Sequence, residues 1–103
     1  MYTVNETSIF RRYADAVWNE DERHSFIDYI AKNPEAGDVI PQSGGLRKVR
    51  WGKAGVGKRG GARVIYFVTN EAGEVTLLII YAKAKFDNLP VSLLKRMKEN
   101  LNG

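Results

Sequence analysis

Seven basic side chains and no acidic one lie between Val39 and Asn70. They are Arg47, Lys48, Arg50, Lys53, Lys58, Arg59 and Arg63. The bias is local, because residues 1–38 hold eight acids and four bases, and residues 71–103 hold four acids and five bases. Ordinary solvated surfaces mix both signs, whereas a long stretch of one sign is typical of a surface that binds phosphate groups. We therefore predict a phosphate-binding surface, with a merely solvated charged face as the alternative.

Strand alternation is expected to gather part of this charge on one face of a sheet. Side chains two residues apart in a strand share a face, which places Lys48 and Arg50 together and Arg47 on the opposite side. Arg63 lies near the start of a second predicted strand, and Tyr81 near the end of a third. If these strands are neighbours, one concave side collects a set of polar groups, namely Lys48, Arg50, Arg63, Tyr81, Lys83 and Lys85.

Such a cluster could bind phosphates and stabilise the pentacoordinate phosphorane of RNA cleavage, since preorganised positive charge favours developing negative charge. RNA supplies its own nucleophile, the 2′-hydroxyl, so the protein must accept that proton and support the leaving 5′-oxygen. A lysine or tyrosine whose pKa is lowered by neighbouring cations could serve as base or acid. A two-histidine mechanism is excluded, because the chain has one histidine. We expect that residue, His24, on the surface of a helix beside Glu20 and Glu22, and no His/Asp/Glu spacing suggests a metal site.

Two glycine-rich motifs imitate nucleotide-binding loops. Gly52–Lys58 nearly matches a P-loop, but Arg59 stands where magnesium binding needs Ser or Thr, and a strand follows where a helix is required. Gly55–Gly60 fits G-x-G-x-x-G and fails on the same context. We interpret the segment as a flexible basic hairpin tip, in which three side chains contact an RNA backbone: Lys53, Lys58 and Arg59.

Periodicity predicts two helices in the N-terminal half, after a short strand over residues 2–6. The first begins at Thr7 or Ser8 and has an apolar face of Ile9, Phe10, Tyr13, Val17 and Trp18. A capping box of Asn19 and Glu22 opens the second, which ends at Asn33 before a proline. Its expected inward residues are Phe26, Ile27, Tyr29 and Ile30.

The C-terminal half alternates with period two and then returns to a helix. Strands are predicted over 46–51, 62–69 and 75–82, the last nearly all apolar and thus buried on both faces. A turn joins the second and third at 70–73. The final helix follows residues 87–90, with an apolar stripe of Val91, Leu94, Met97 and Leu101. The order β-α-α-β-β-β-α predicts an α+β fold with helices on a small, mostly antiparallel sheet.

Length and composition agree with one domain over residues 1–103. The chain lacks cysteine, which excludes disulfide frameworks and thiolate metal sites. No apolar run approaches the ~20 residues that span a bilayer, and Met1–Phe10 shows no signal-peptide pattern. We therefore expect a cytoplasmic protein.

Three segments together resemble the HigB branch of the RelE/ParE toxin superfamily: Gly44–Arg50, Gly57–Tyr66 and Leu78–Lys83. Length and predicted element order agree, so the resemblance covers nearly the whole chain. It implies a single RelE/HigB-like toxin domain with a microbial RNase-type fold. It also implies an mRNA interferase that needs no metal or cofactor and cleaves mRNA in the ribosomal A site. The partners implied are the ribosome and a cognate antitoxin, typically with a helix-turn-helix domain.

Residue by residue, the resemblance assigns phosphate binding and transition-state stabilisation to Lys48, Arg50 and Arg63, with Lys83 and Lys85 as further basic groups after the last strand. Tyr81 is a candidate catalytic group, although relatives place a catalytic tyrosine nearer the last helix, where this chain has Phe86. The general base is therefore left open. Arg47, Lys53, Lys58, Arg59 and Lys85 are expected to bind RNA or the ribosome. Two alternatives remain: a gyrase poison of the ParE kind, and a nucleic-acid-binding module without catalysis.

Overall fold

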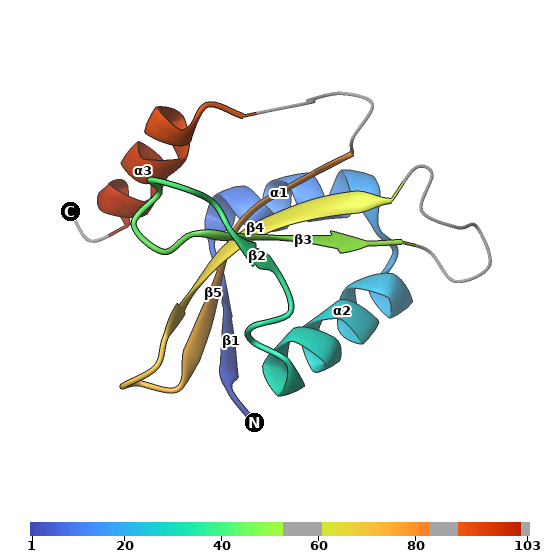
Figure 1. Cartoon of the computed structure of the whole chain (residues 1–103). Coiled ribbons are helices and arrows are strands. Elements are labelled where there is room, and N and C mark those ends of the chain that lie inside the picture. The colour runs from blue at the N-terminus through green and yellow to red at the C-terminus, as the bar shows by residue number, and fades with distance from the viewer. Residues whose placement is uncertain (53–60, 83–88, 102–103) are drawn as a thin grey trace.

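A computed structural model describes residues 1–52, 61–82 and 89–101. This part of the chain holds five strands and three helices (Figure 1). They are β1 (Thr3–Glu6), α1 (Ser8–Val17), α2 (Glu20–Lys32), β2 (Asp38–Val39), β3 (Arg47–Trp51), β4 (Ala62–Thr69), β5 (Glu74–Ala82) and α3 (Val91–Asn100). The α+β class and the predicted order of elements are confirmed, with β2 as an addition.

The strands form a single mixed sheet in the order β1-β5-β4-β3-β2. β1 runs parallel to β5, and the other pairs are antiparallel. The two-residue strand β2 was not predicted, since two residues cannot show an alternating pattern. β5 lies between β1 and β4 and is buried on both faces, as its apolar sequence predicts, with Ile80 in one core cluster and Tyr81 in the other.

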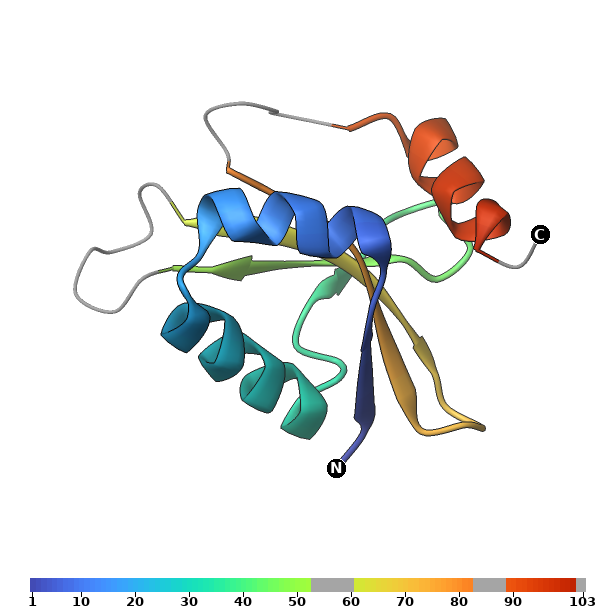
Figure 2. The same ribbon diagram turned by 180° about the vertical axis from the view of Figure 1, so that it is seen from behind.

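Two apolar clusters hold the helices to opposite faces of the sheet. α1 and α2 lie together over one face, and α3 lies apart from them near the chain's C-terminus (Figure 2). The larger cluster joins the two N-terminal helices to the sheet through Phe10, Phe26 and Tyr66. The smaller one packs Leu94 of α3 against the other face. The predicted caps are confirmed, because Thr7 accepts from the Phe10 N–H and Asn19 forms the capping box with Glu22.

The predicted apolar faces of the helices are wrong at three residues, which are exposed and not buried. Ile9 and Tyr13 of α1 are 40 % and 42 % exposed, and Leu101 after α3 is 44 % exposed. α1 instead buries Phe10 and Ala14, which lie one helical turn apart, so its buried stripe is narrower than the apolar pattern suggested. Nor does any helix in the described ranges have the length and apolar character needed to cross a membrane.

Candidate active site

Strand register places three of the predicted site residues in one row. Arg50 of β3 pairs with Arg63 of β4, and Arg63 pairs with Tyr81 of β5. Directly paired residues of antiparallel strands share a face, so the three side chains project together on the face that carries α3. Lys48 pairs with Ile65 two residues away and lies on this same face. The convergence predicted for these four residues is therefore present in the fold.

Arg63 is the buried member of this row. The residue is 6 % exposed, and its Nη1 has no hydrogen-bond partner among the residues that the structure describes. Buried polar groups are nearly always hydrogen-bonded, and an unpaired buried charge is costly. An anionic ligand that accepts from Nη1 would remove this cost. Arg50 beside it is exposed and Lys48 is half-buried, so both are accessible to the same ligand.

A groove of about 550 Å³ opens over these residues. Its lining consists of Tyr29, Ala36, Asp38, Lys48, Val49, Arg50 and Arg63. The groove exists because β2 is short: it covers the edge of β3 only at Arg47 and Lys48, and no described residue extends that ladder to the end of β3. Within the described chain this part of the β3 edge is unpaired, which leaves the side of the sheet beside the arginines accessible to a ligand.

A smaller hollow of about 300 Å³ lies where α3 meets the sheet. Two polar side chains, Lys48 and Tyr81, share it with the apolar residues Ile40, Ile65, Leu89, Pro90, Val91 and Leu94. Lys48 also lines the larger groove, so a cationic opening and an apolar one meet at this side chain. A nucleotide has an anionic phosphate and an apolar base. The cationic groove suits the phosphate, and the apolar hollow suits the base.

Tyr81 is 4 % exposed, and its electrostatics differ from the sequence expectation. Burial raises the pKa of the Tyr81 phenol above its ordinary value, and the opposing effect of the Arg63 charge is smaller. The predicted lowering of a tyrosine pKa by neighbouring cations is thus wrong for Tyr81. A phenol with a raised pKa stays protonated at neutral pH, so it can donate a proton and is a poor base.

Arg47 lies on the opposite face of β3 and contacts the segment between α2 and β2. Its guanidinium donates to the carbonyl oxygens of Glu35 at 3.3 Å and Gly37 at 2.7 Å. The fully buried Tyr66 holds the same segment: its hydroxyl accepts from the Gly37 N–H and donates to the Pro34 carbonyl, both at 2.8 Å. Arg47 thus positions the wall of the groove, and its role in RNA binding stays a prediction. Sequence reasoning missed Tyr66, because a strand tyrosine gives no sign of its hydroxyl's partners.

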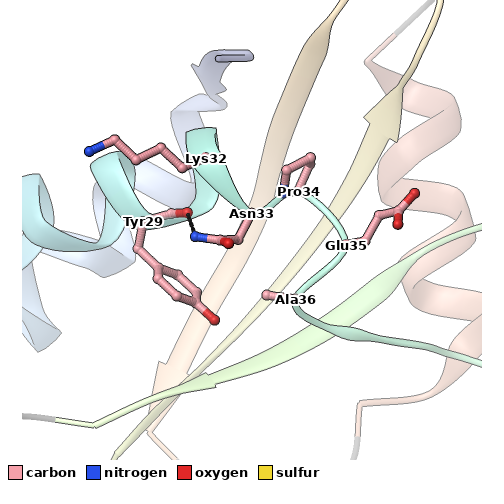
Figure 3. A pocket seen from close by; sticks show the side chains of 6 residues that line it. All are labelled: Tyr29, Lys32, Asn33, Pro34, Glu35 and Ala36. Carbon is pink, nitrogen blue, oxygen red and sulfur yellow. Dashed lines mark hydrogen bonds between the residues drawn. The ribbon is translucent and has the colours of Figure 1, made fainter.

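A further pocket of about 400 Å³ adjoins the groove at the end of α2 (Figure 3). Tyr29 and Ala36 line both, and the Tyr29 ring extends toward Ala36 while the Lys32 amine points away (Figure 3). Tyr29 also packs on Trp51, with ring centroids 4.8 Å apart. Tyr29 therefore lines the groove and is supported by the Trp51 ring.

The remaining predicted residues fall into two groups. Lys53, Lys58, Arg59, Lys83 and Lys85, together with the glycine-rich hairpin tip, lie outside the described residues. His24 is exposed on α2, with Nε2 3.9 Å from a Glu20 oxygen, so its expected surface position is confirmed. Throughout the described ranges, no group of three or more His, Cys, Asp or Glu side chains could hold a metal ion.

Because Tyr66 and Tyr81 are buried, we expect the protein to lose stability at alkaline pH. Burial raises the pKa of Tyr66, as it does that of Tyr81, above the unfolded value of about 10. A raised folded pKa means that the native state holds its proton more tightly, so this stabilisation is fully present below about pH 10 and is lost as pH rises through the folded pKa. We expect the free energy of unfolding, measured with urea from pH 9 to 11, to fall less steeply for Tyr66→Phe. Equal slopes for the variant and the wild type would contradict this expectation.

Several solved structures share the fold, including the following three. A variant of the E. coli toxin RelE in the free state superimposes with a TM-score of 0.63 over 94% of this chain and 96% of that one, at 13% identity. The isolated E. coli RelE toxin gives 0.60 over 98% and 99%, at 10% identity. The toxin–antitoxin complex RelBE2 from Mycobacterium tuberculosis gives 0.60 over 79% and 96%, at 18% identity. No family model matches the chain. At these identities the likeness defines the fold alone: the protein has the fold of the RelE toxins.

Proposed function

We propose that this protein is the toxin of a type II toxin–antitoxin system and acts as a ribosome-dependent endoribonuclease on mRNA. The observation that carries the proposal is the buried Arg63 guanidinium, unpartnered among the described residues at Nη1 and in register with Arg50 and Tyr81. A surface that only attracts nucleic acid needs exposed charge. A buried, preorganised cation beside a proton donor is the arrangement that stabilises a charged transition state.

The roles follow from the position of each group. Arg63 and Arg50 bind the non-bridging oxygens of the scissile phosphate and stabilise the phosphorane as the 2′-hydroxyl attacks. Lys48, between the groove and the apolar hollow, binds the same or the neighbouring phosphate. Tyr81 donates a proton to the leaving 5′-oxygen, which agrees with the raised pKa of its phenol. Lys83 is proposed as a further cation of this site, and Lys53, Lys58, Arg59 and Lys85 as contacts to mRNA or the ribosome.

The proposed partner is a cognate antitoxin, and the proposed compartment is the cytoplasm, where ribosomes are found. The fold's likeness to a toxin solved in a toxin–antitoxin complex supports an antitoxin. The sequence resemblance to the HigB branch favours one with a helix-turn-helix domain.

The test is to incubate the purified protein with a defined mRNA, with and without translating ribosomes, and to map the new ends. We expect cuts only with ribosomes, leaving a 2′,3′-cyclic phosphate and a 5′-hydroxyl. These cuts should be lost in Arg63→Ala. Arg12→Ala is its matched control, because Arg12 is an exposed arginine of α1 outside the site. Cuts in naked RNA would remove the ribosome requirement. An absence of cuts, combined with inhibition of purified gyrase, would replace the proposal with a gyrase poison.

A further inference from the structure

Asp38 brings a carboxylate to the basic groove. It is the first residue of β2 and pairs directly with Lys48, so the two side chains share the face that carries Arg50 and Arg63. It is exposed and lines the groove together with both arginines. No described residue forms an ion pair or hydrogen bond with the Asp38 side chain, although Lys48 lies directly across the ladder. An acid with so many cationic neighbours and no bond to them is available to a ligand.

The backbone next to this carboxylate is held at a fixed position. Gly37 donates its N–H to the buried Tyr66 hydroxyl and accepts from Arg47 through its carbonyl oxygen. A Cβ on Gly37 would lie 2.8 Å from the Lys48 carbonyl oxygen, so the segment packs directly on β3. Groups that take part in chemistry need this kind of support from their surroundings. The exposed Asp38 therefore projects from a rigid base.

Asp38 is also the carboxylate among the described residues that line the groove, and a carboxylate can accept a proton. Arginine and lysine side chains donate hydrogen bonds and do not accept them. The other polar side chains that line the groove are Lys48, Arg50, Arg63 and Tyr29. Of the described side chains lining it, Asp38 has the one carboxylate. Tyr81, in the same row as the arginines, is a donor because burial raises its pKa.

The spacing leaves room for a substrate. Asp38 and Arg63 are two strands and two residues apart, roughly 12 Å between backbone positions by standard sheet spacings. A long arginine and a short aspartate reaching inward from these positions can hold a 2′-hydroxyl and its adjacent phosphate between them. The carboxylate then faces the nucleophile while the guanidinium faces the phosphate.

We propose that Asp38 is the general base of the cleavage reaction, which rests on the function proposed above. An Asp38 carboxylate oxygen takes the proton of the 2′-hydroxyl as the O2′–P bond forms. The P–O5′ bond breaks, and the 5′-oxygen takes a proton from the Tyr81 phenol. Solvent exchange then returns one proton to the phenol and removes one from the aspartic acid. The products are a 2′,3′-cyclic phosphate and a 5′-hydroxyl, so atoms and charges balance.

The experiment compares wild type, Asp38→Asn and Tyr81→Phe on ribosomes programmed with a synthetic mRNA, under single-turnover conditions. Two mRNAs are used, one with the natural 5′-oxygen and one with sulfur replacing that oxygen at the cut, because a thiolate leaves without protonation. We expect Asp38→Asn to be about a hundredfold slower on both. Tyr81→Phe should be slow on the oxygen substrate and near wild-type on the sulfur substrate. Both variants are isosteric or nearly so, and unchanged melting temperatures would show that the fold is kept.

The outcomes separate the proposed function from the role of Asp38. A wild type that cuts neither mRNA would overturn the proposed function together with this inference. A wild type that cuts, with Asp38→Asn within threefold of it, would leave the function standing and overturn the role of Asp38. The same applies if the sulfur substrate restores Asp38→Asn to wild-type rates, since Asp38 would then serve the leaving group. Weaker binding of the mRNA–ribosome complex, sufficient to account for the slower rate, would likewise assign Asp38 to positioning of the substrate.

Discussion

Replacing Arg63 with methionine is expected to slow cleavage by about two to three orders of magnitude while leaving the protein at least as stable as the wild type. Loss of one preorganised donor to a developing oxyanion lowers kcat by about 10²- to 10³-fold. Arg63 is 6 % exposed, and its Nη1 lacks a partner within the described chain. Replacing this buried charge, which forms no ion pair within the described chain, by an apolar side chain of similar volume removes the desolvation penalty of the charge. Ribosome-dependent cleavage and urea denaturation of the same preparations measure the two effects.

Two controls separate the buried site from general positive charge. Arg63→Lys keeps the charge and loses the planar fork of donors, so its activity should fall between those of wild type and Arg63→Met. Arg12→Ala removes an exposed arginine of α1 and should cut mRNA at the wild-type rate. Inorganic phosphate should raise the melting temperature of the wild type more than that of Arg63→Met, because it binds the native state at the unpaired group. An Arg63→Met variant that is less stable and fully active would contradict the assignment of this residue.

The sequence predicts the face on which Arg63 lies but not its burial. Alternation predicted that it shares a face with Lys48 and Arg50 on neighbouring strands, and the register confirms this. Alternation could not predict its burial, because burial depends on tertiary packing around the strand and not on its pattern. Sequence pattern likewise predicted cations near Tyr81, from which we expected a lowered pKa. The outcome is the reverse because desolvation of the phenol exceeds the effect of Arg63.

Asp38 shows what local patterns cannot reveal. It is the last of eight acids in the N-terminal segment, next to the boundary of the basic stretch, so composition assigns it to the other half of the molecule. In the fold, Asp38 lies on the basic face because the two-residue strand β2 pairs it with Lys48. A ladder of this length depends on tertiary contacts, here those of Tyr66 and Arg47 with Gly37. Tertiary packing also explains why Ile9 and Tyr13 are exposed although they were predicted to lie on the apolar face of α1. Periodicity defines that face, and packing decides how much of it is covered.

Gly37→Ala is expected to destabilise the fold by about 1–3 kcal/mol, the typical cost of overpacking. The added Cβ would lie 2.8 Å and 2.9 Å from the carbonyl oxygen and carbon of Lys48, and 3.0 Å from the Tyr66 ring. These contacts involve β3 backbone and a buried ring, neither of which yields easily, so the segment must move away from the sheet. That movement stretches the bonds from Arg47 and Tyr66 and displaces Asp38 from the groove, so cleavage should fall as well.

Denaturation by urea and single-turnover cleavage of programmed ribosomes measure both losses, with Glu35→Ala as the control in the same segment. The Glu35 side chain is exposed, and Arg47 contacts only its backbone carbonyl, so this variant should match the wild type. Tyr66→Phe, which removes the partner of the Gly37 N–H and the Pro34 carbonyl, should cost about 1–3 kcal/mol. Because both changes act on one hydrogen-bonded unit, the double variant should lose less stability than the sum of the two. Additive losses would mean that Gly37 and Tyr66 support the groove independently, and that the segment carrying Asp38 is not held as a single unit.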